Sequence, residues 1–431
     1  MPTHGDTLIV GAGPAGLAAA RALREYDLPY THVERHSAAG GLWDIDNPGS
    51  PMYESAHFIS SKTLSGFTGF PMPDDYPDYP SHRQILSYLR DFADAYGLTE
   101  RVRFDTAVTD IRRDDASGTY EATFADGSRG TYESVIAASG VQWDPLAPEI
   151  PGDFAGEIRH SVTYRDASEF AGKRVLVVGA GNSGCDIACD AARTADSAAI
   201  SMRRGYWFIP KHIFGMPVDV FAEQGPSMPM AVEQAVFGRL LRIINGDVTR
   251  LGLQAPDHKL FETHPILNDQ LLHHLGHGDI TARPGIASAS GHTVTFTDGT
   301  EQDFDLILLA TGYRHTIPYA QSLYGESTHP DMYLTAFGRT PGLFGVGFVE
   351  TNSGAYQLME MLAAMVAQHI ADLVAHPEAW ERFERHIAND QPDLSGGIRF
   401  VSSPRHEGYV DSHAIGKYLR MVARRMGWEL P

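Results

Sequence analysis

Residues 8–16 read Leu-Ile-Val-Gly-Ala-Gly-Pro-Ala-Gly, and this stretch decides the fold. It is a short apolar run that leads into a glycine-rich turn, and residues 17–23 then read as an apolar helix. Such a turn needs glycine for tightness, for close approach of the backbone to a pyrophosphate, and for packing of helix on strand. The free N–H groups at the start of the helix would face the anion. The stretch predicts a dinucleotide site contacted by Gly11, Gly13, Pro14, Ala15 and Gly16.

The same pattern occurs a second time. Residues 175–178 are apolar, and the turn after them contains Gly179, Gly181, Asn182, Ser183 and Gly184. Gly179 follows Gly11 by 179 − 11 = 168 positions. We therefore expect a second dinucleotide site of the same construction.

A further repeat at nearly the same spacing supports a duplication. Six residues recur 172 positions later (296 − 124 = 172): Phe124, Asp126, Gly127, Glu133, Ala138 and Gly140 return as Phe296, Asp298, Gly299, Asp305, Ala310 and Gly312. Each Asp-Gly pair predicts a hairpin turn, and residues 133–140 and 305–312 each predict a buried parallel strand. The sequence predicts an α/β protein with two Rossmann-like dinucleotide-binding domains.

The ends of two predicted strands suggest which nucleotide each site takes. Glu34 lies 18 residues after Gly16 (34 − 16), where a carboxylate binds a ribose 2′-hydroxyl and repels a 2′-phosphate. This favours FAD or NAD at the first site. The matching strand of the second unit ends in Arg203 and Arg204, and guanidinium groups suit a phosphate monoester. The second site should prefer NADPH, with Arg203 the better placed of the two by spacing.

Composition and charge exclude several classes of protein. The 431 residues are 43% hydrophobic and 20% charged, which is typical of a globular chain. The net charge of −20 argues against nucleic acid or an anionic membrane as a partner. No signal peptide and no stretch approaching a membrane span are expected. The two cysteines, Cys185 and Cys189, cannot form a disulfide framework, and they fit a cytoplasmic location.

No metal is expected at the five histidines between His258 and His277. His273 and His274 are adjacent rather than one helical turn apart, and no carboxylate–histidine motif accompanies them. The two cysteines are expected to be small buried side chains rather than a redox pair.

The chain resembles the flavin-containing monooxygenases, a group with Baeyer–Villiger and N-hydroxylating relatives. Phe154, Gly156, His160 and Tyr164 fit the identifying pattern of that family, at offsets of 2, 6 and 10. Residues 34–43, 70–82 and 309–313 are also similar to family segments. The resemblance implies an FAD-binding domain in residues 1–165, an NADP-binding domain in 166–312 inserted into it, with a helical insertion at about 205–290, and a return of the FAD domain in 313–431. It also implies further cofactor contacts at Arg35, Gly41, Leu42, Trp43, His82, Val108, Gly140, Thr311, Gly312, Tyr313 and Gln357.

The resemblance implies a reaction in two halves. NADPH reduces FAD, and O₂ then adds to the flavin to give a C4a-hydroperoxyflavin, whose distal oxygen passes to a nucleophilic nitrogen or sulfur of a small organic substrate. Protein residues orient the cofactors and exclude water. Candidates for contact with the reacting groups are Ser60, Ser61, His160 and Asn352.

One position departs from the family pattern. Many N-oxygenating members have an asparagine where this chain has Ile59, and isoleucine cannot donate a hydrogen bond. Baeyer–Villiger oxygenation of a ketone therefore stays open, as do a reductase that passes electrons to a carrier and a redox-sensing nucleotide binder without enzymatic activity.

The rest of the chain is less informative. Helices are expected at residues 230–244, 266–275 and 356–375, and aromatic residues near Trp207 are candidates for either a substrate channel or core. The tail from Asp393, with Arg405, His406, Tyr409 and Asp411, is expected to wrap the surface or to form an interface, as in a homodimer.

Overall fold

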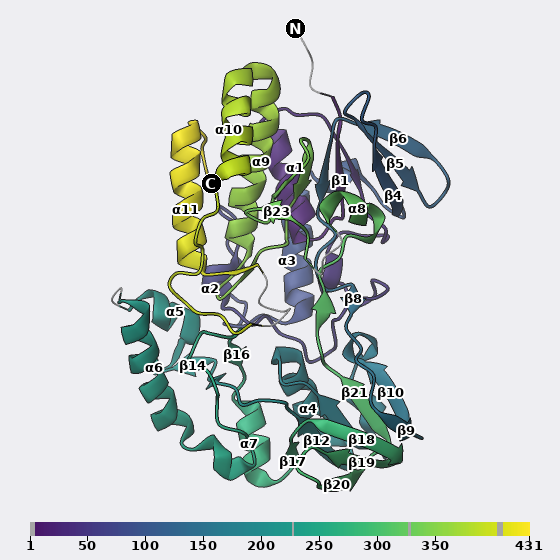
Figure 1. Ribbon diagram of the computed structural model, residues 1–431, viewed down its shortest axis with the longest axis vertical. Coiled ribbons are helices and arrows are strands. Elements are labelled where there is room, and N and C mark those ends of the chain that lie inside the picture. Colours follow the sequence, from purple (N-terminus) through teal and green to yellow (C-terminus); the bar gives the residue numbers. More distant parts are fainter. Residues whose placement is uncertain (1–4, 226–227, 326–328, 403–407) are drawn as a thin grey trace.

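Both glycine-rich stretches connect a buried strand to a helix, as predicted. In the computed structural model, which describes residues 5–225, 228–325, 329–402 and 408–431, the first stretch joins β1 (Thr7–Val10) to α1 (Pro14–Glu25). The second joins β11 (Arg174–Val178) to α4 (Asn182–Thr194). One lobe of the molecule surrounds each stretch (Figure 1).

The sheet of the first lobe draws its strands from both ends of the chain. Among the described residues the order is β23 (Met332–Tyr333), β24 (Phe337–Gly338), β25 (Leu343–Gly345), β7 (Ser134–Ala137), β1, β2 (Tyr30–Val33) and β3 (Val102–Arg103). From β25 to β3 all neighbours are parallel. Since β23 to β25 follow the second lobe in sequence, the second dinucleotide unit is inserted into the first, as expected.

The sheet of the second lobe is parallel throughout. Its order within the described ranges is β10 (Glu157–His160), β21 (Leu306–Leu309), β11, β12 (Ser197–Ser201) and β17 (Ile280–Arg283). The four residues of β21 are fully buried or nearly so, which fits their continuous apolar sequence. β10 already belongs to this sheet, so residue 165, the expected end of the first segment, lies after the first strand of the second lobe.

Each unit also has a small, mainly antiparallel sheet, in which β9 (Gly152–Phe154) of the second unit alone pairs in parallel, and each small sheet contains one of the predicted Asp-Gly turns. Gly127 (φ +82°) lies between β5 (Tyr120–Phe124) and β6 (Arg129–Tyr132). Gly299 (φ +81°) lies between β19 (Thr293–Phe296) and β20 (Glu301–Asp303). The remaining strands of these sheets are β4 (Val108–Arg113), β9 (Gly152–Phe154) and β18 (Ile286–Gly291). The repeat seen in the sequence is therefore a structural repeat.

The long predicted helix is α9 (Tyr356–Ala375), and it packs against α1 in the core of the first lobe. In the described part of the chain, α9 is the one helix long and apolar enough to span a membrane by length and composition. The expectation that no stretch approaches this length was therefore wrong. Its most apolar window is 72% buried inside the protein, as in the core helix of a folded domain.

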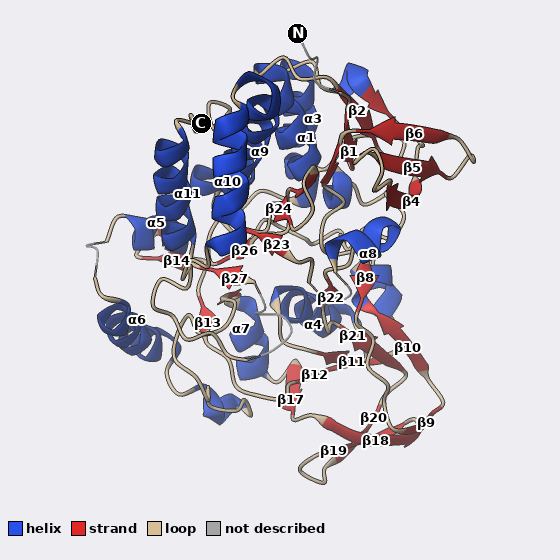
Figure 2. Cartoon of the chain, turned by 45° about the horizontal axis from the view of Figure 1, so that its top comes forward, coloured by secondary structure: helices blue, strands red, loops and turns tan. Residues whose placement is uncertain are grey.

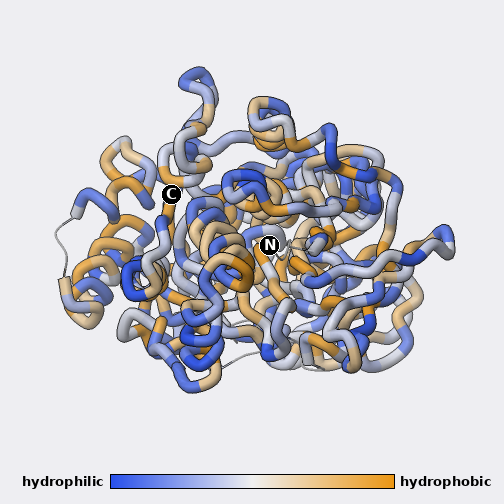
Figure 3. The backbone as a smooth tube through the Cα atoms, turned by 90° about the horizontal axis from the view of Figure 1, so that it is seen from above, coloured by the Kyte–Doolittle hydropathy of each residue, from blue (hydrophilic) through white to orange (hydrophobic). Residues whose placement is uncertain are grey.

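Helices cover the outer face of the first lobe (Figure 2). They are α3 (His82–Ala95), α10 (Pro377–Asn389) and α11 (Ser412–Met426), and the shorter α2 (Lys62–Ser65) precedes α3 in the chain. α8 (Gln321–Tyr324) packs with β4 and β5 on the other side of the sheet. Hydrophilic segments are concentrated in the outlying loops, whereas hydrophobic segments run through the interior (Figure 3).

The insertion in the second unit is partly helical. α6 (Met230–Asn245) confirms the helix expected at 230–244, and α5 (Val218–Glu223) precedes it. The helix expected at 266–275 begins late, because residues 266–267 form β16 (Ile266–Leu267) beside β13 (Phe208–Ile209) and α7 (Gln270–His277) follows. β14 (His212–Ile213) and β15 (Met216–Pro217) form a short hairpin.

The C-terminal tail folds back onto the first lobe. β27 (Tyr409–Val410) pairs with β26 (Glu350–Thr351), and Asp411 caps α11 by accepting a hydrogen bond from the Ala414 N–H. Arg405 and His406 lie outside the described residues.

Candidate active site

A cavity of about 720 Å³ lies where the two lobes meet, and both glycine-rich turns contribute to its wall. Many of the residues predicted to contact a cofactor line it: Gly11, Gly13, Pro14, Ala15, Glu34, Arg35, Gly41, Leu42, Trp43, Val108, Gly140, Gly181, Asn182, Ser183, Gly184, Gly312 and Tyr313. One continuous space thus reaches both predicted dinucleotide sites.

The first turn has the shape that a pyrophosphate requires. Gly11 has φ +108°, and a Cβ built on Gly16 would lie 1.8 Å from the carbonyl oxygen of Gly11. Both positions therefore need glycine for the fold itself. Gly13 differs, because its φ is −76° and a Cβ there would meet nothing closer than 3.4 Å. Gly13 faces the cavity and leaves room for a phosphate group against the backbone.

The second turn repeats this geometry closely. Gly179 has φ +107°, and a Cβ on Gly184 would lie 2.0 Å from the Gly179 carbonyl oxygen. Even the neighbouring strands match: a Cβ on Gly11 would lie 2.6 Å from the Ala138 oxygen, and one on Gly179 would lie 2.4 Å from the Ala310 oxygen. The residues present therefore fit two bound dinucleotides.

The end of β2 holds a carboxylate at the edge of the first turn. Glu34 is 5% exposed and accepts hydrogen bonds from the Ala12 N–H (2.6 Å) and the His36 N–H (2.8 Å). Arg35 extends across the ring of Trp143, 4.1 Å from its centre, and burial lowers the pKa of this arginine. The two residues fix the wall on which an adenosine ribose would rest.

The arginines expected to select NADPH follow β12 in the second lobe. Neither Arg203 nor Arg204 lines the cavity. Arg203 is exposed and its stem packs beside Gly285, whereas Arg204 lies 3.9 Å from the carboxylate of Asp257. Within the described ranges no carboxylate forms an ion pair with Arg203, which makes it the better candidate of the two for a phosphate.

Three neighbouring positions near the expected flavin ring differ in their roles. Ile59 and Ser60 line the cavity. Ser61 does not, because it is fully buried at the N-cap of α2 and its N–H donates to Asp219 (2.6 Å). The Ser60 hydroxyl accepts a hydrogen bond from Ser65 (2.8 Å) and therefore keeps its own proton for a second partner.

His160 acts through the backbone of its neighbours. Its Nδ1 accepts from the Val162 N–H (3.1 Å), so the proton is on Nε2, which donates to the Gly312 carbonyl (3.1 Å). Burial lowers the pKa of His160, which keeps the ring neutral and preserves both bonds. Gly312 lines the cavity and His160 does not, so His160 is joined to the cavity wall through this carbonyl, and the predicted catalytic role of His160 stays a prediction.

Tyr164, the last residue of the family pattern, binds a carboxylate that also contacts the first lobe. It is fully buried, and its hydroxyl donates to Asp190 on α4 (2.9 Å). Ser55 from the first lobe donates to the same carboxylate oxygen. The aromatic position thus carries a polar bridge that phenylalanine or tryptophan could not supply in the same place.

Several other predicted contacts lie off the cavity wall in the described structure. His82 is buried at the start of α3, Gln357 is exposed, and the Thr311 hydroxyl donates to the Leu146 carbonyl. Asn352 donates to the carboxylate of Asp411 (3.0 Å) and so holds the C-terminal tail. The roles proposed for these residues stay predictions.

The sequence did not single out some residues of the wall. Trp143 stacks on Arg35, and the Tyr319 hydroxyl donates a hydrogen bond to the Ser139 hydroxyl (3.1 Å), next to Gly140. Asp186 on α4 accepts from Tyr53 (3.2 Å) and Asn268 (2.6 Å), and burial raises its pKa. No short motif marks these positions, and the one local signal is that Trp143 lies close after Gly140 in the chain.

The spacing of the histidines in the insertion differs from the expectation in one respect. His273 and His277 do lie one turn apart on α7, with ring centres 4.1 Å apart. They are not part of the one group of three or more metal-ligating side chains found among the described residues. Cys185 and Cys189 are free and buried, as expected.

Comparison with known proteins agrees with this geometry. Residues 6–389 match the family model described as flavin-binding monooxygenase-like. The chain is 31% identical over 359 residues to indole-3-pyruvate monooxygenase YUCCA1 of Oryza sativa subsp. japonica, covering 80% of this chain and 86% of that one. It is 28% identical over 438 residues to flavin-containing monooxygenase 5 of Homo sapiens, covering 94% and 80%. The solved structure of an oxidized steroid monooxygenase bound to NADP has a TM-score of 0.73 at 19% identity and covers 99% of this chain and 98% of that chain.

These matches confirm the expected fold, the FAD and NADPH cofactors and the enzymatic class. The matched residues 6–389 include every residue that lines the cavity, so the chain is an enzyme of this class rather than a nucleotide binder without enzymatic activity. The chain belongs to the flavin-binding monooxygenase-like family.

Proposed function

We propose that this enzyme transfers one oxygen atom from O₂ to a nucleophilic nitrogen or sulfur of a small organic molecule. The observation that carries the proposal is the single cavity shared by two dinucleotide turns of matching geometry. Bound together, FAD and NADPH supply hydride transfer and oxygen activation. The protein has then to hold the two cofactors in contact, admit a substrate and exclude water.

The lining supports a small and largely uncharged substrate. Phe58, Ile59, Tyr313 and Val349 give the wall an apolar part. Ser60 is the hydroxyl best placed to donate a hydrogen bond near the expected flavin, because its acceptor lone pair is already used by Ser65. His160 holds the Gly312 carbonyl in place, and so fixes the edge of the cavity where the second lobe begins.

Baeyer–Villiger oxygenation of a ketone is a second candidate, and Ile59 favours it. This apolar side chain lines the cavity where many N-oxygenating relatives have an amide donor. One similar plant protein is named for indole-3-pyruvate and one similar mouse protein for N-oxide formation from dimethylaniline, so proteins similar to this chain are named for different substrates.

The test is product analysis with matched substrates. The FAD-loaded enzyme is given NADPH, labelled dioxygen and, in separate reactions, a thioether, a tertiary amine or a cyclic ketone. We expect one labelled oxygen atom in a sulfoxide or N-oxide, with NADPH and product in equal amounts. A labelled lactone as the sole product would establish the second candidate instead. NADPH oxidation with hydrogen peroxide and no product in any reaction would contradict both, and would favour a reductase.

We further propose that the enzyme acts in the cytoplasm. The two free and buried thiols support a reducing compartment.

A further inference from the structure

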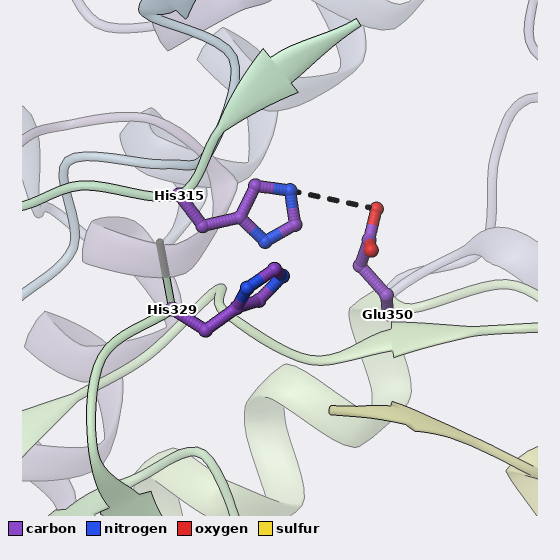
Figure 4. A group of neighbouring side chains, drawn as sticks. All are labelled: His315, His329 and Glu350. Carbon is purple, nitrogen blue, oxygen red and sulfur yellow. Dashed lines mark ion pairs between the residues drawn. The ribbon is translucent and has the colours of Figure 1, made fainter. Parts of the chain in front are cut away.

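Three side chains that the proposed reaction does not use converge beside the cavity. His315, His329 and Glu350 each offer a ligand atom, and these atoms all lie within 4.8 Å of one another. The His315 Nε2 is 3.8 Å from the Glu350 Oε1, and the two imidazole centres are 4.4 Å apart with their planes at 63°. Figure 4 shows the three groups pointing toward a common point from three separate segments.

Two of the three residues are held by nearby structure. His315 follows β22 (Tyr313–Arg314), which pairs with β8 (Asp144–Pro145) and is fixed by two hydrogen bonds from Arg314 to Asp144 (2.9 and 2.7 Å). Its side chain is 8% exposed. Glu350 begins β26, whose pairing with β27 fixes its backbone. The site is therefore largely preformed, and it is partly shielded from water.

The donor set is the one that divalent transition metals prefer. Two imidazoles and one carboxylate form the protein part of many zinc sites and of facial non-haem iron sites, each with an open position for water or substrate. Ligands about 2.1 Å from a tetrahedral ion lie about 3.4 Å from one another. The widest pair in this cluster would have to approach by about 1.4 Å, which side-chain rotation can supply.

We propose that His315, His329 and Glu350 bind a divalent transition-metal ion of the Zn²⁺ type, with one coordination position open. The ion would join the segment that leaves the second lobe (His315) to the segment that leads into α9 (Glu350). Glu350 lines the cavity, so the open position lies close to the space predicted for the cofactors and substrate. A bound ion would therefore fix the junction of the lobes.

Metal binding is tested directly on the FAD-loaded protein after treatment with a chelator. Zn²⁺ is titrated in competition with a coloured chelator, and Co²⁺ is titrated while its visible ligand-field absorption is recorded. We expect one ion per chain and an intense Co²⁺ spectrum typical of four-coordination. Glu350→Gln and His329→Ala should each weaken Zn²⁺ binding by about 100-fold or more, since loss of even an outer-shell partner costs about 10- to 100-fold. Zn²⁺ should also raise the melting temperature of the wild type but not that of either variant.

The matched control is His277→Ala, which removes one member of the other histidine pair, on α7. This variant should bind Zn²⁺ like the wild type. Retained FAD and an unchanged circular dichroism spectrum show that each variant is folded. His329 lies outside the regular elements, so His329→Ala tests the site if Glu350→Gln does not fold. Failure of the wild type to take up Zn²⁺ or Co²⁺ would overturn the proposal. So would binding that survives both Glu350→Gln and His329→Ala but is lost in His277→Ala.

Discussion

Gly13→Ala should separate flavin binding from folding. At this position φ is −76°, which alanine adopts readily, and the added methyl group would meet only Gly41, at 3.4 Å. Replacing glycine by alanine in a compatible conformation stabilises a protein by about 0.4–1 kcal/mol, because the unfolded chain loses freedom. The flavin-free variant should therefore be as resistant to urea as the wild type, or slightly more so.

The same methyl group projects into the space where the pyrophosphate of FAD is expected. Forcing one extra methyl group into a close-packed contact costs about 1–3 kcal/mol, which corresponds to a dissociation constant raised about 5- to 150-fold. The assay is a titration of flavin-free protein with FAD, followed by quenching of flavin fluorescence, beside urea unfolding of the same sample.

Gly16→Ala is the matched control, because its methyl group would lie 1.8 Å from the carbonyl oxygen of Gly11. The backbone has to move, so this variant should lose stability even without FAD. The reasoning is refuted if Gly13→Ala binds FAD as tightly as the wild type. It is equally refuted if Gly13→Ala unfolds as readily as Gly16→Ala, since the glycine would then be required by the fold.

Three further variants test the second site, a buried tyrosine near the contact between the lobes and a buried histidine. Arg203→Ala should raise the KM for NADPH about 10- to 100-fold with little change in the KM for NADH, whereas Arg204→Ala should raise the KM for NADPH less. Steady-state kinetics with both coenzymes measure these values. Equal losses with NADH and NADPH would show that Arg203 does not bind the phosphate. Tyr164→Phe deletes a buried hydrogen bond to the Asp190 carboxylate, so the free energy of unfolding should fall by about 1.5–3 kcal/mol. A change below about 0.5 kcal/mol would show that this hydrogen bond does not stabilise the fold. His32 is fully buried with its pKa lowered to about 4 by burial, and it is neutral in the fold. Below about pH 6.5 the unfolded chain is protonated at His32 and the folded chain is not, which destabilises the fold by about 3 kcal/mol as the pH approaches 4. His32→Gln should therefore show a flatter dependence of the urea midpoint on pH between 7.5 and 4.5 than the wild type. Parallel curves for the two proteins would contradict this account.

The fold could be predicted from the sequence because its signals are local. The two glycine turns, the two Asp-Gly hairpins and the long helix at 356–375 each depend on residues close together in the chain. β10 was harder to assign, because only its pairing with β21, about 150 residues later, places it in the second sheet. Residues 266–267 likewise became a strand because β13 offers them a partner.

The site could be predicted only in part, because many of its contacts join residues that are far apart in the chain. Positions next to a turn, such as Glu34 and Gly41, line the cavity as expected. The role of Asn352 depends on Asp411, 59 residues away, which no local pattern reveals. The His315, His329 and Glu350 cluster also joins distant segments, and its spacing in sequence resembles no metal motif.

The identity of each cofactor must be decided outside the glycine turns. Gly11 and Gly179 have φ values of +108° and +107°, and Gly16 and Gly184 are crowded by the same backbone oxygen in each turn. Backbone turns of such similar shape can each accept a pyrophosphate, so their glycine geometry does not by itself distinguish FAD from NADPH. The difference lies one strand away, where the first unit ends in the buried carboxylate of Glu34 and the second continues to the exposed Arg203. A carboxylate repels a 2′-phosphate and a guanidinium binds it, so we expect the charge at this strand end to decide which nucleotide each unit accepts.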